Sequence, residues 1–145
     1  MIVYADASLL VKRYLIEAGS EQVIALLTPQ TTVGTALISR AEVSAALARA
    51  VRVNIITRAD AEKSLAEFRS HWPYMLRLRL NEAVATRADE LAWEHNLRGY
   101  DAVHLAAALI WQSGLDEPLF LGTYDRQLWQ AGQNTGLGVW PATLA

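Results

Sequence analysis

Short apolar runs alternate with stretches of helical periodicity along this chain, and that alternation is what most constrains its fold. The runs are predicted strands, and they read IVYA (2–5), TTVGT (31–35), MLRLRL (75–80), PLFLG (118–122) and LGVW (137–140). Between the runs, apolar residues recur at the three- and four-residue spacing that is typical of helices. Strands that alternate with helices form right-handed βαβ units, so the sequence predicts a mostly parallel central sheet flanked by helices, a three-layer α/β/α fold. LGVW is expected to close the sheet as an edge strand.

The predicted helices fill the gaps between these runs. They cover 9–16, 20–27, Ser39 to about residue 51, Thr57 or Asp60 to about His71, Asn81 (as a cap) to His95, Asp101 to Gly114, and Asp125 to Ala131. The small side chains at 106–108 would let the helix after Asp101 approach the sheet closely. Gly99 would free the backbone in front of that helix.

Composition limits the class of protein and of partner. A chain of 145 residues with 52% hydrophobic side chains can bury the core of one domain, expected over 1–145. The absence of cysteine excludes disulfides and thiolate metal sites and is typical of a reducing cytoplasm. The start MIVYADASLLVKRY lacks the order of a signal peptide, and no apolar run is long enough to span a membrane. The net charge of −2 gives no general attraction to nucleic acid, so a polyanionic substrate would need a local basic patch or a bound cation.

Four acidic residues stand where a predicted strand passes into a helix, or close to such a point. They are Asp6 after 2–5, Glu42 soon after 31–35, Asp101 at the start of its helix, and Asp125 after 118–122. In an open parallel sheet, ligands bind at the carboxyl ends of the strands. All four acids are therefore expected to face one edge of the sheet.

Each acid taken alone has a structural explanation. Asp6 and Asp101 could cap a helix or turn, and Asp125 could favour the dipole of the helix that it opens. Ser39 and Glu42 have the spacing of a capping box, in which the two side chains satisfy each other's backbone donors. Gathered at one edge, however, four carboxylates would repel and raise one another's pKa values unless a cation compensates. Mg²⁺ and Mn²⁺ prefer oxygen ligands, so the set predicts a site for such an ion.

Basic residues lie close in sequence to these acids. They are Lys12, Arg13, Arg40, Arg98 and Arg126. A basic rim around an acidic metal centre suits a metal-dependent phosphodiesterase, because the cation acts on the scissile phosphate and the rim holds its neighbours. The alternative is that each is a solvated helix residue or a carboxylate partner.

Four stretches resemble, in the same order, those of PIN-domain ribonucleases, and above all the VapC-type toxins of toxin–antitoxin systems. They read YADASLLVKRY, SRAEVSAAL, LRGYDAVHLAAA and GTYDRQL, and the resemblance runs from Ile2 nearly to the end of the chain. Carried over position by position, the family's acidic quartet matches Asp6, Glu42, Asp101 and Asp125, and its accompanying hydroxyl residues match Ser8 and Thr123.

This resemblance implies a PIN-fold, metal-dependent endoribonuclease that acts as the toxin of a toxin–antitoxin pair. Asp6 and Asp101 are expected to hold Mg²⁺ or Mn²⁺ directly, and Glu42 and Asp125 directly or through water. Ser8 and Thr123 would orient these carboxylates or waters. The implied partners are an RNA substrate, a cognate antitoxin and a second copy in a homodimer. The segment 45–70, apolar on one face, is the candidate wall of the antitoxin groove.

Two other functions stay open at this point. A haloacid-dehalogenase-like phosphatase also begins with an aspartate after its first strand, but it needs a second aspartate two positions later, where this chain has Ser8. A binding module could keep the PIN fold without catalysis. His104, one turn after Asp101, could complete a metal pair, although a histidine hydrogen-bonded near the site is the preferred interpretation. The tryptophans at 93, 111 and 129 are expected in the core or in a dimer interface.

Overall fold

The computed structural model describes residues 1–144 and contains a five-stranded sheet in the order β3-β2-β1-β4-β5. The strands are β1 (Ile2–Ala5), β2 (Thr32–Ala36), β3 (Leu76–Leu78), β4 (Leu119–Gly122) and β5 (Gly138–Trp140). Every neighbouring pair is parallel. The predicted α/β/α fold is confirmed, and β5 closes one edge as expected. All the carboxyl ends of the strands therefore meet at one side of the molecule.

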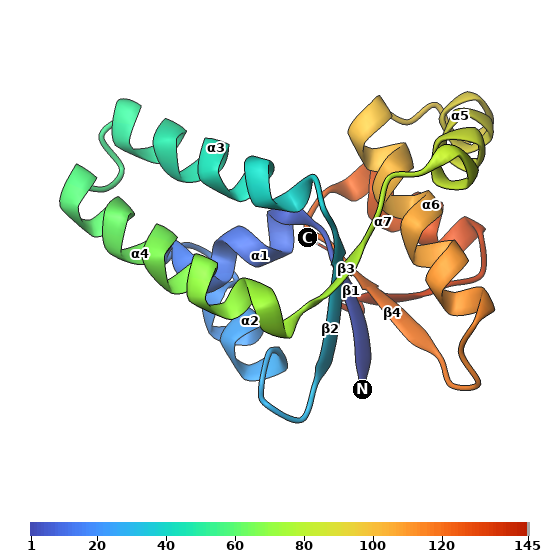
Figure 1. Ribbon diagram of the computed structural model, residues 1–145, viewed down its shortest axis with the longest axis horizontal. Coiled ribbons are helices and arrows are strands. Elements are labelled where there is room, and N and C mark those ends of the chain that lie inside the picture. Colours follow the sequence, from blue (N-terminus) through green and yellow to red (C-terminus); the bar gives the residue numbers. More distant parts are fainter. Residues whose placement is uncertain (145) are drawn as a thin grey trace.

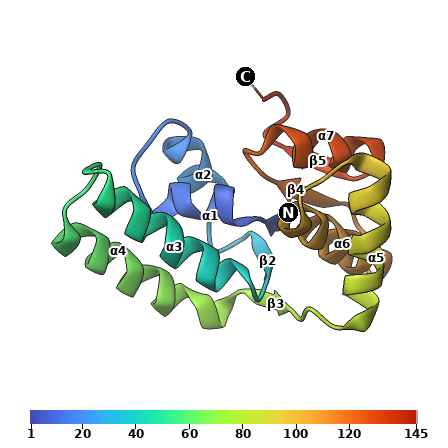
Figure 2. The ribbon, with the colours of Figure 1, turned by 90° about the horizontal axis from the view of Figure 1, so that it is seen from above.

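Helices cover both faces of this sheet (Figures 1 and 2). They are α1 (Ala7–Tyr14), α2 (Ser20–Leu26), α3 (Ser39–Arg52), α4 (Arg58–His71), α5 (Glu82–His95), α6 (Gly99–Ser113) and α7 (Arg126–Asn134), with a short 3₁₀ helix η1 (Trp72–Tyr74). Helices α1 to α4 lie on one face and α5 to α7 on the other. Two hydrophobic clusters, one on each face, form the core. Within residues 1–144, no helix has the length and apolar character needed to cross a membrane.

Side-chain caps begin several of these helices. Thr57 caps α4 and Asn81 caps α5, which confirms both predicted starts. Asp6 accepts from the backbone N–H of Leu9, so α1 begins two residues earlier than its apolar spacing indicated. A polar cap gives no hydrophobic periodicity, and the pattern therefore located the helix but not its first turn.

The predicted start of α6 is wrong. The helix begins at Gly99, with Arg98 at its N-cap, so Asp101 lies inside the first turn and caps nothing. The expected backbone freedom of Gly99 is also not needed, because only Gly19 and Gly136 among the described glycines have a positive φ. A Cβ at Gly99 would contact nothing within 4 Å.

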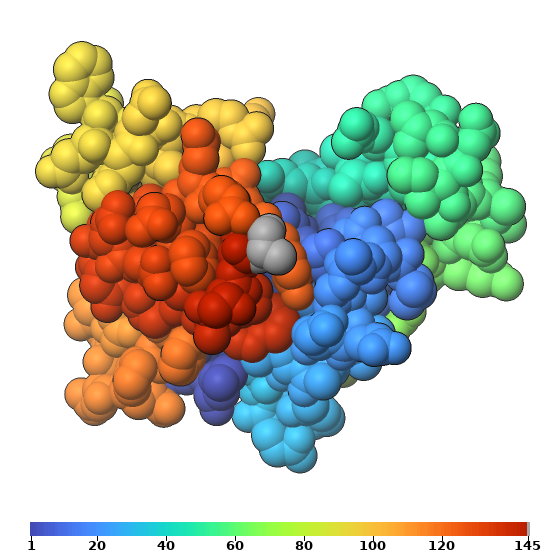
Figure 3. Space-filling view, turned by 180° about the vertical axis from the view of Figure 1, so that it is seen from behind, coloured from blue at the N-terminus to red at the C-terminus, as the bar shows by residue number. Residues whose placement is uncertain are grey.

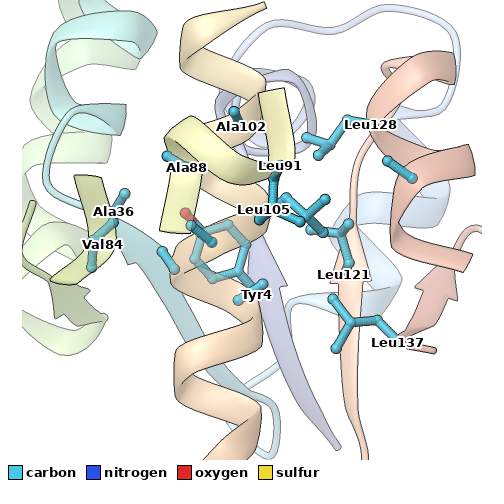
Figure 4. Packing of buried hydrophobic residues seen from close by; sticks show 14 of the residues in the cluster. Tyr4, Ala36, Val84, Ala88, Leu91, Ala102, Leu105, Leu121, Leu128 and Leu137 are labelled. Carbon is cyan, nitrogen blue, oxygen red and sulfur yellow. The ribbon is translucent and has the colours of Figure 1, made fainter. Parts of the chain in front are cut away.

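Small residues do bring α6 onto the sheet, as predicted. Ala106, Ala107 and Ala108 are all buried. In the same hydrophobic cluster, Tyr4 of β1 lies beside Leu105 and Leu121 (Figure 4). Trp111 packs on Gly34 of β2, where a Cβ would overlap its indole ring.

The other tryptophans have varied environments. Trp72 is buried, and Trp129 donates from Nε1 to the carbonyl oxygen of Pro141 at 2.8 Å. Trp93 is 91% exposed, so it does not lie in the core of the domain, and the dimer interface stays as the prediction for it. The apolar spacing of a helix does not by itself say whether a flanking aromatic side chain points inward.

We predict that Gly34→Ala lowers the free energy of unfolding by about 1–3 kcal/mol, because the added methyl group must displace the ring of Trp111. Urea denaturation followed by circular dichroism measures the change. Gly99→Ala is the matched control, since its methyl group meets no neighbour, and it is expected to be neutral or to stabilise by up to about 1 kcal/mol. Equal losses in the two variants would contradict this account of how α6 packs.

Candidate active site at the carboxyl edge of the sheet

Asp6 lies at the end of β1 and is only 3% exposed. Its Oδ1 accepts from the backbone N–H of Leu9 at 2.9 Å and from the Ser8 hydroxyl at 2.7 Å. Its Oδ2 accepts from the Thr123 hydroxyl at 2.6 Å. A buried carboxylate requires such donors, because an unpaired charge in the protein interior is costly. Asp6 is thus both a helix cap and the most enclosed acid of the four.

The hydroxyl residues Ser8 and Thr123 join the ends of β1 and β4. Thr123 is buried and its Oγ1 also accepts from the backbone N–H of Asp125 at 3.0 Å. Ser8 Oγ accepts from the backbone N–H of Tyr124 at 2.9 Å. Each hydroxyl therefore donates to Asp6 while it accepts from the segment that carries Asp125. This places both residues where the sequence predicted them, in contact with the acids.

A guanidinium group bridges two of the acids. Arg98 donates from Nε to Oδ2 of Asp101 at 3.2 Å and from Nη2 to Oδ2 of Asp125 at 3.0 Å. Asp125 also caps α7 through the backbone N–H of Leu128. The Arg98 side chain is 73% exposed, whereas those of Asp101 and Asp125 are 12% and 24% exposed. The bridge therefore lies over the solvent side of the site.

Glu42 reaches the site from α3 on the opposite face of the sheet. Its Oε1 lies 2.8 Å from Nε2 of His104, whose Nδ1 lies 2.7 Å from the hydroxyl of Tyr4. This confirms the preferred interpretation of His104 as a hydrogen-bonded histidine near the site. The capping box is wrong: Ile38 is the N-cap of α3, and the Ser39 hydroxyl pairs with Thr35 Oγ1 at 2.6 Å.

The pKa values show that the acids share one electrostatic environment. Burial raises the pKa of Asp6, and the charge of His104 offsets part of that effect. Burial and the nearby charge of Asp125 raise the pKa of Asp101, and Arg98 and His104 oppose them. His104 acts on both Asp6 and Asp101, so both acids lie near it. Their negative charge is only partly compensated by the protein.

In the described part of the chain, no three histidine or acidic side chains approach closely enough to form a ready-made metal-binding group. The acids instead occur as three hydrogen-bonded units: Asp6 with its hydroxyl donors, Asp101 and Asp125 with Arg98, and Glu42 with His104. Mg²⁺ usually takes only one or two carboxylates and completes its coordination with water and phosphate. An all-oxygen set of this kind fits such an ion.

The other predicted basic residues do not contact the acids in residues 1–144. Lys12 pairs with Glu17 at 3.0 Å and lies 4.5 Å from the centre of the Tyr124 ring. The remaining three are engaged elsewhere: Arg13 with Glu67, Arg40 over the ring of Trp72, and Arg126 with the carbonyl oxygen of Leu144. Sequence proximity to an acid did not decide which basic side chain reaches it.

A cavity of about 300 Å³ adjoins the acids between α1 and α3. Ser8, Lys12, Glu42 and Tyr124 are among the residues that line it. Figure 3 shows the surface hollowed between the yellow part of the chain, α5 and α6, and the green part, α3 and α4. Of the four acids, Glu42 is the one that lines the cavity between α1 and α3, whereas Asp6 and Asp101 are buried.

Tyr4, whose hydroxyl is buried next to His104, is not among the site residues that the sequence predicts. A tyrosine inside the otherwise aliphatic run IVYA was the available signal, because a buried phenol needs a hydrogen-bond partner.

We predict that Asp101→Asn raises the melting temperature in metal-free buffer by about 2–4 °C, which corresponds to about 1 kcal/mol in a chain of this size. Asparagine keeps the shape of the side chain and removes a buried charge that Asp125 repels. Differential scanning calorimetry in EDTA measures the shift. Asp89→Asn, at an exposed position on α5, is the control and is expected to change nothing. A lower melting temperature for Asp101→Asn would show that the ion pair with Arg98 outweighs the repulsion.

Comparison with known proteins identifies the family. The PIN domain family matches residues 3–131 of this chain. Ribonuclease VapC45 of Mycobacterium tuberculosis (strain CDC 1551 / Oshkosh) is 37% identical over 146 residues, which cover 99% of this chain and 97% of that protein. Two solved structures share the fold: a toxin–antitoxin complex from Klebsiella pneumoniae (TM-score 0.67, 17% identity, 99% of each chain covered) and the sarcin-ricin loop cleaving toxin VapC20 of Mycobacterium tuberculosis (TM-score 0.66, 14% identity, 99% of each chain covered). This chain therefore belongs to the PIN-domain family and is of the VapC type.

Proposed function

We propose that this protein is a metal-dependent endoribonuclease that acts as the toxin of a toxin–antitoxin pair. The observation that carries the proposal is that four acids from different elements lie at one edge of the sheet, in a chain that is 37% identical to Ribonuclease VapC45 over 97% of that protein. Partly compensated carboxylates are costly to a fold, and a metal site is a reason to keep them.

In this proposal, Asp6 and Asp101 hold Mg²⁺ or Mn²⁺ directly, and Glu42 and Asp125 hold it directly or through water. The bound cation supplies positive charge that favours the attack of water on a phosphodiester and stabilises the leaving oxygen. The raised pKa values of Asp6 and Asp101 support the assignment, because an adjacent cation would relieve the cost of burying their charge.

The side chains around the acids then have distinct roles. Ser8 and Thr123 fix both oxygens of Asp6, so this carboxylate is oriented before a ligand arrives. Arg98 is exposed and can leave Asp125 to bind a phosphate of the RNA. Lys12 lines the adjoining cavity and is a second proposed phosphate contact. The proposed outer contacts of RNA are Arg13, Arg40 and Arg126, each of which would have to leave its present partner.

We predict that cleavage of single-stranded or loop RNA requires Mg²⁺ or Mn²⁺, stops in EDTA, and is abolished by Asp6→Asn. Asparagine caps a helix about as well as aspartate, so the variant is expected to fold. Gel analysis of labelled RNA measures cleavage, with Asp89→Asn as the active control.

Three outcomes would contradict the proposal. Cleavage that persists in EDTA would remove the metal mechanism. Hydrolysis of small phosphate esters without RNA cleavage would favour a phosphatase. RNA binding without cleavage would favour a catalytically silent module.

An antitoxin is the proposed protein partner, and the structural neighbour from Klebsiella pneumoniae is itself a toxin–antitoxin complex. The segment 45–70 forms the antiparallel pair α3 and α4, which projects beyond the sheet (Figure 1). A cavity of about 430 Å³ lies along this pair, with Leu47, Ala48, Val51, Ala61 and Leu65 on its apolar side. We propose that an apolar helix of the antitoxin lies here. We further propose a single domain over 1–145, a homodimer and a cytoplasmic location.

We predict that Ala48→Glu weakens binding of the antitoxin, because Ala48 is exposed and borders this cavity. Leu47 is 2% exposed and packs within the domain, so a charge there would test folding instead of binding. Ala66→Glu, on an exposed position of α4 that does not line the cavity, is the control. Calorimetric titration with a cognate antitoxin, sought as a small DNA-binding protein in a neighbouring reading frame, measures affinity. Equal affinities for the two variants would place the groove elsewhere.

A further inference from the structure

A chain of three polar side chains crosses the protein interior from β1 to α3. Tyr4 is fully buried in β1, His104 is 2% exposed in α6, and Glu42 lies at the start of α3. The hydroxyl of Tyr4 and Nδ1 of His104 are 2.7 Å apart, and Nε2 of His104 and Oε1 of Glu42 are 2.8 Å apart. The rings of Tyr4 and His104 meet edge to face, with centroids 5.8 Å apart. Both ring nitrogens of His104 therefore have a partner.

The chemistry of Glu42 decides which way these hydrogen bonds run. An ionised carboxylate only accepts hydrogen bonds, so Nε2 of His104 must carry the proton that faces it. In the neutral imidazole, Nδ1 is then an acceptor, and the Tyr4 hydroxyl donates to it. When the imidazole is charged, Nδ1 donates to the Tyr4 oxygen instead, and in both forms the proton on Nε2 is directed at Glu42.

The contact with His104 is what fixes the Glu42 side chain. Helices α3 and α6 lie on opposite faces of the sheet (Figure 2). In residues 1–144 the Glu42 carboxylate has no hydrogen bond other than the one from His104, and its side chain is 29% exposed. Without that donor, a glutamate has rotatable bonds enough to leave the site. Asp6 needs no such help, because two hydroxyls and a backbone N–H already hold it.

We propose that His104 is a positioning residue that holds Glu42 beside Asp6 and Asp101 for metal binding, with Tyr4 orienting the imidazole. This inference rests on the proposed nuclease function, since it gives the relay a role in the same site. A purely structural relay is the competing explanation. A buried polar network of this kind could be replaced by apolar side chains with little loss of stability, so stability alone does not require it.

The test removes the whole relay, so that only Glu42, which is partly exposed to solvent, loses its hydrogen-bond donor. The Tyr4→Phe/His104→Leu variant deletes the phenol and the imidazole together, so neither is buried without a partner. Its melting temperature is expected to stay close to that of the wild type. Mn²⁺ binding, measured by electron paramagnetic resonance of the free ion, is expected to weaken by about 10- to 100-fold, as when other groups that orient a metal ligand are removed.

Two further variants keep the test specific. In a Glu42→Gln background, Tyr4→Phe/His104→Leu is expected to cause no further loss of Mn²⁺ affinity, because the relay acts only through Glu42. His104→Gln retains an N–H donor toward Glu42 and is expected to recover part of the affinity. If the double variant does not fold, the Mn²⁺ affinities of the single variants His104→Gln and Tyr4→Phe still show how metal binding depends on the donor that faces Glu42.

Each outcome decides between the explanations. A folded double variant with wild-type Mn²⁺ affinity would overturn the positioning role, as would an equal loss in the Glu42→Gln background. A wild-type protein that binds no Mn²⁺ would contradict the proposed metal site and this inference together. Affinities that follow the expected order in a protein that cleaves no RNA would support the positioning role and refute the nuclease.

Discussion

The rest of the site depends on the hydrogen bond between the Thr123 hydroxyl and the Asp6 carboxylate, 2.6 Å long and buried. It joins the ends of β1 and β4, which are neighbours in the sheet but 117 residues apart in sequence. The same hydroxyl accepts from the backbone of Asp125, so the start of α7 is placed relative to Asp6. If the hydroxyl were lost, Oδ2 of Asp6 and the backbone N–H of Asp125 would each lose a partner, at a cost of about 1–3 kcal/mol for each group.

The site keeps negative charge that the fold alone does not need. Burial raises the pKa values of Asp6 and Asp101, so both carboxylates are less favourable in their charged form here than in water. Arg98 compensates Asp101 and Asp125 from the solvent side, and His104 compensates Glu42 from the interior. The two compensating side chains differ in their freedom to move. The exposed guanidinium of Arg98 can leave its partners, whereas the buried imidazole of His104 cannot. The open side of the site is therefore the side from which a cation or phosphate can enter.

Local signals in the sequence located most elements and two helix caps. Alternating apolar runs predicted the five strands, and Asn81 and Thr57 marked helix starts, because these effects act within a few neighbouring residues. Local signals gave wrong predictions where a tertiary contact offers a side chain another partner than the nearby backbone. Ser39 and Glu42 have the spacing of a capping box, but Thr35 and His104 offer each of them a buried partner instead. Asp101 lies near a helix start, but its carboxylate accepts a hydrogen bond from Arg98 instead of capping the helix.

By itself, the sequence determined the α/β/α class, the edge at which the acids gather and the family. The order of strands and helices along the chain and the family motifs can both be recognised from local residue patterns. Only the tertiary structure decided how the acids are held. Tyr4 and His104 are 100 residues apart in sequence, and Arg98 and Asp125 are 27 apart. No residue pattern close to them in the sequence predicts those contacts. It also decided that Leu47 faces the core while Trp93 faces solvent. A side chain's partner depends on which face of which element meets it, and that follows from packing the whole sheet and not from spacing along one helix.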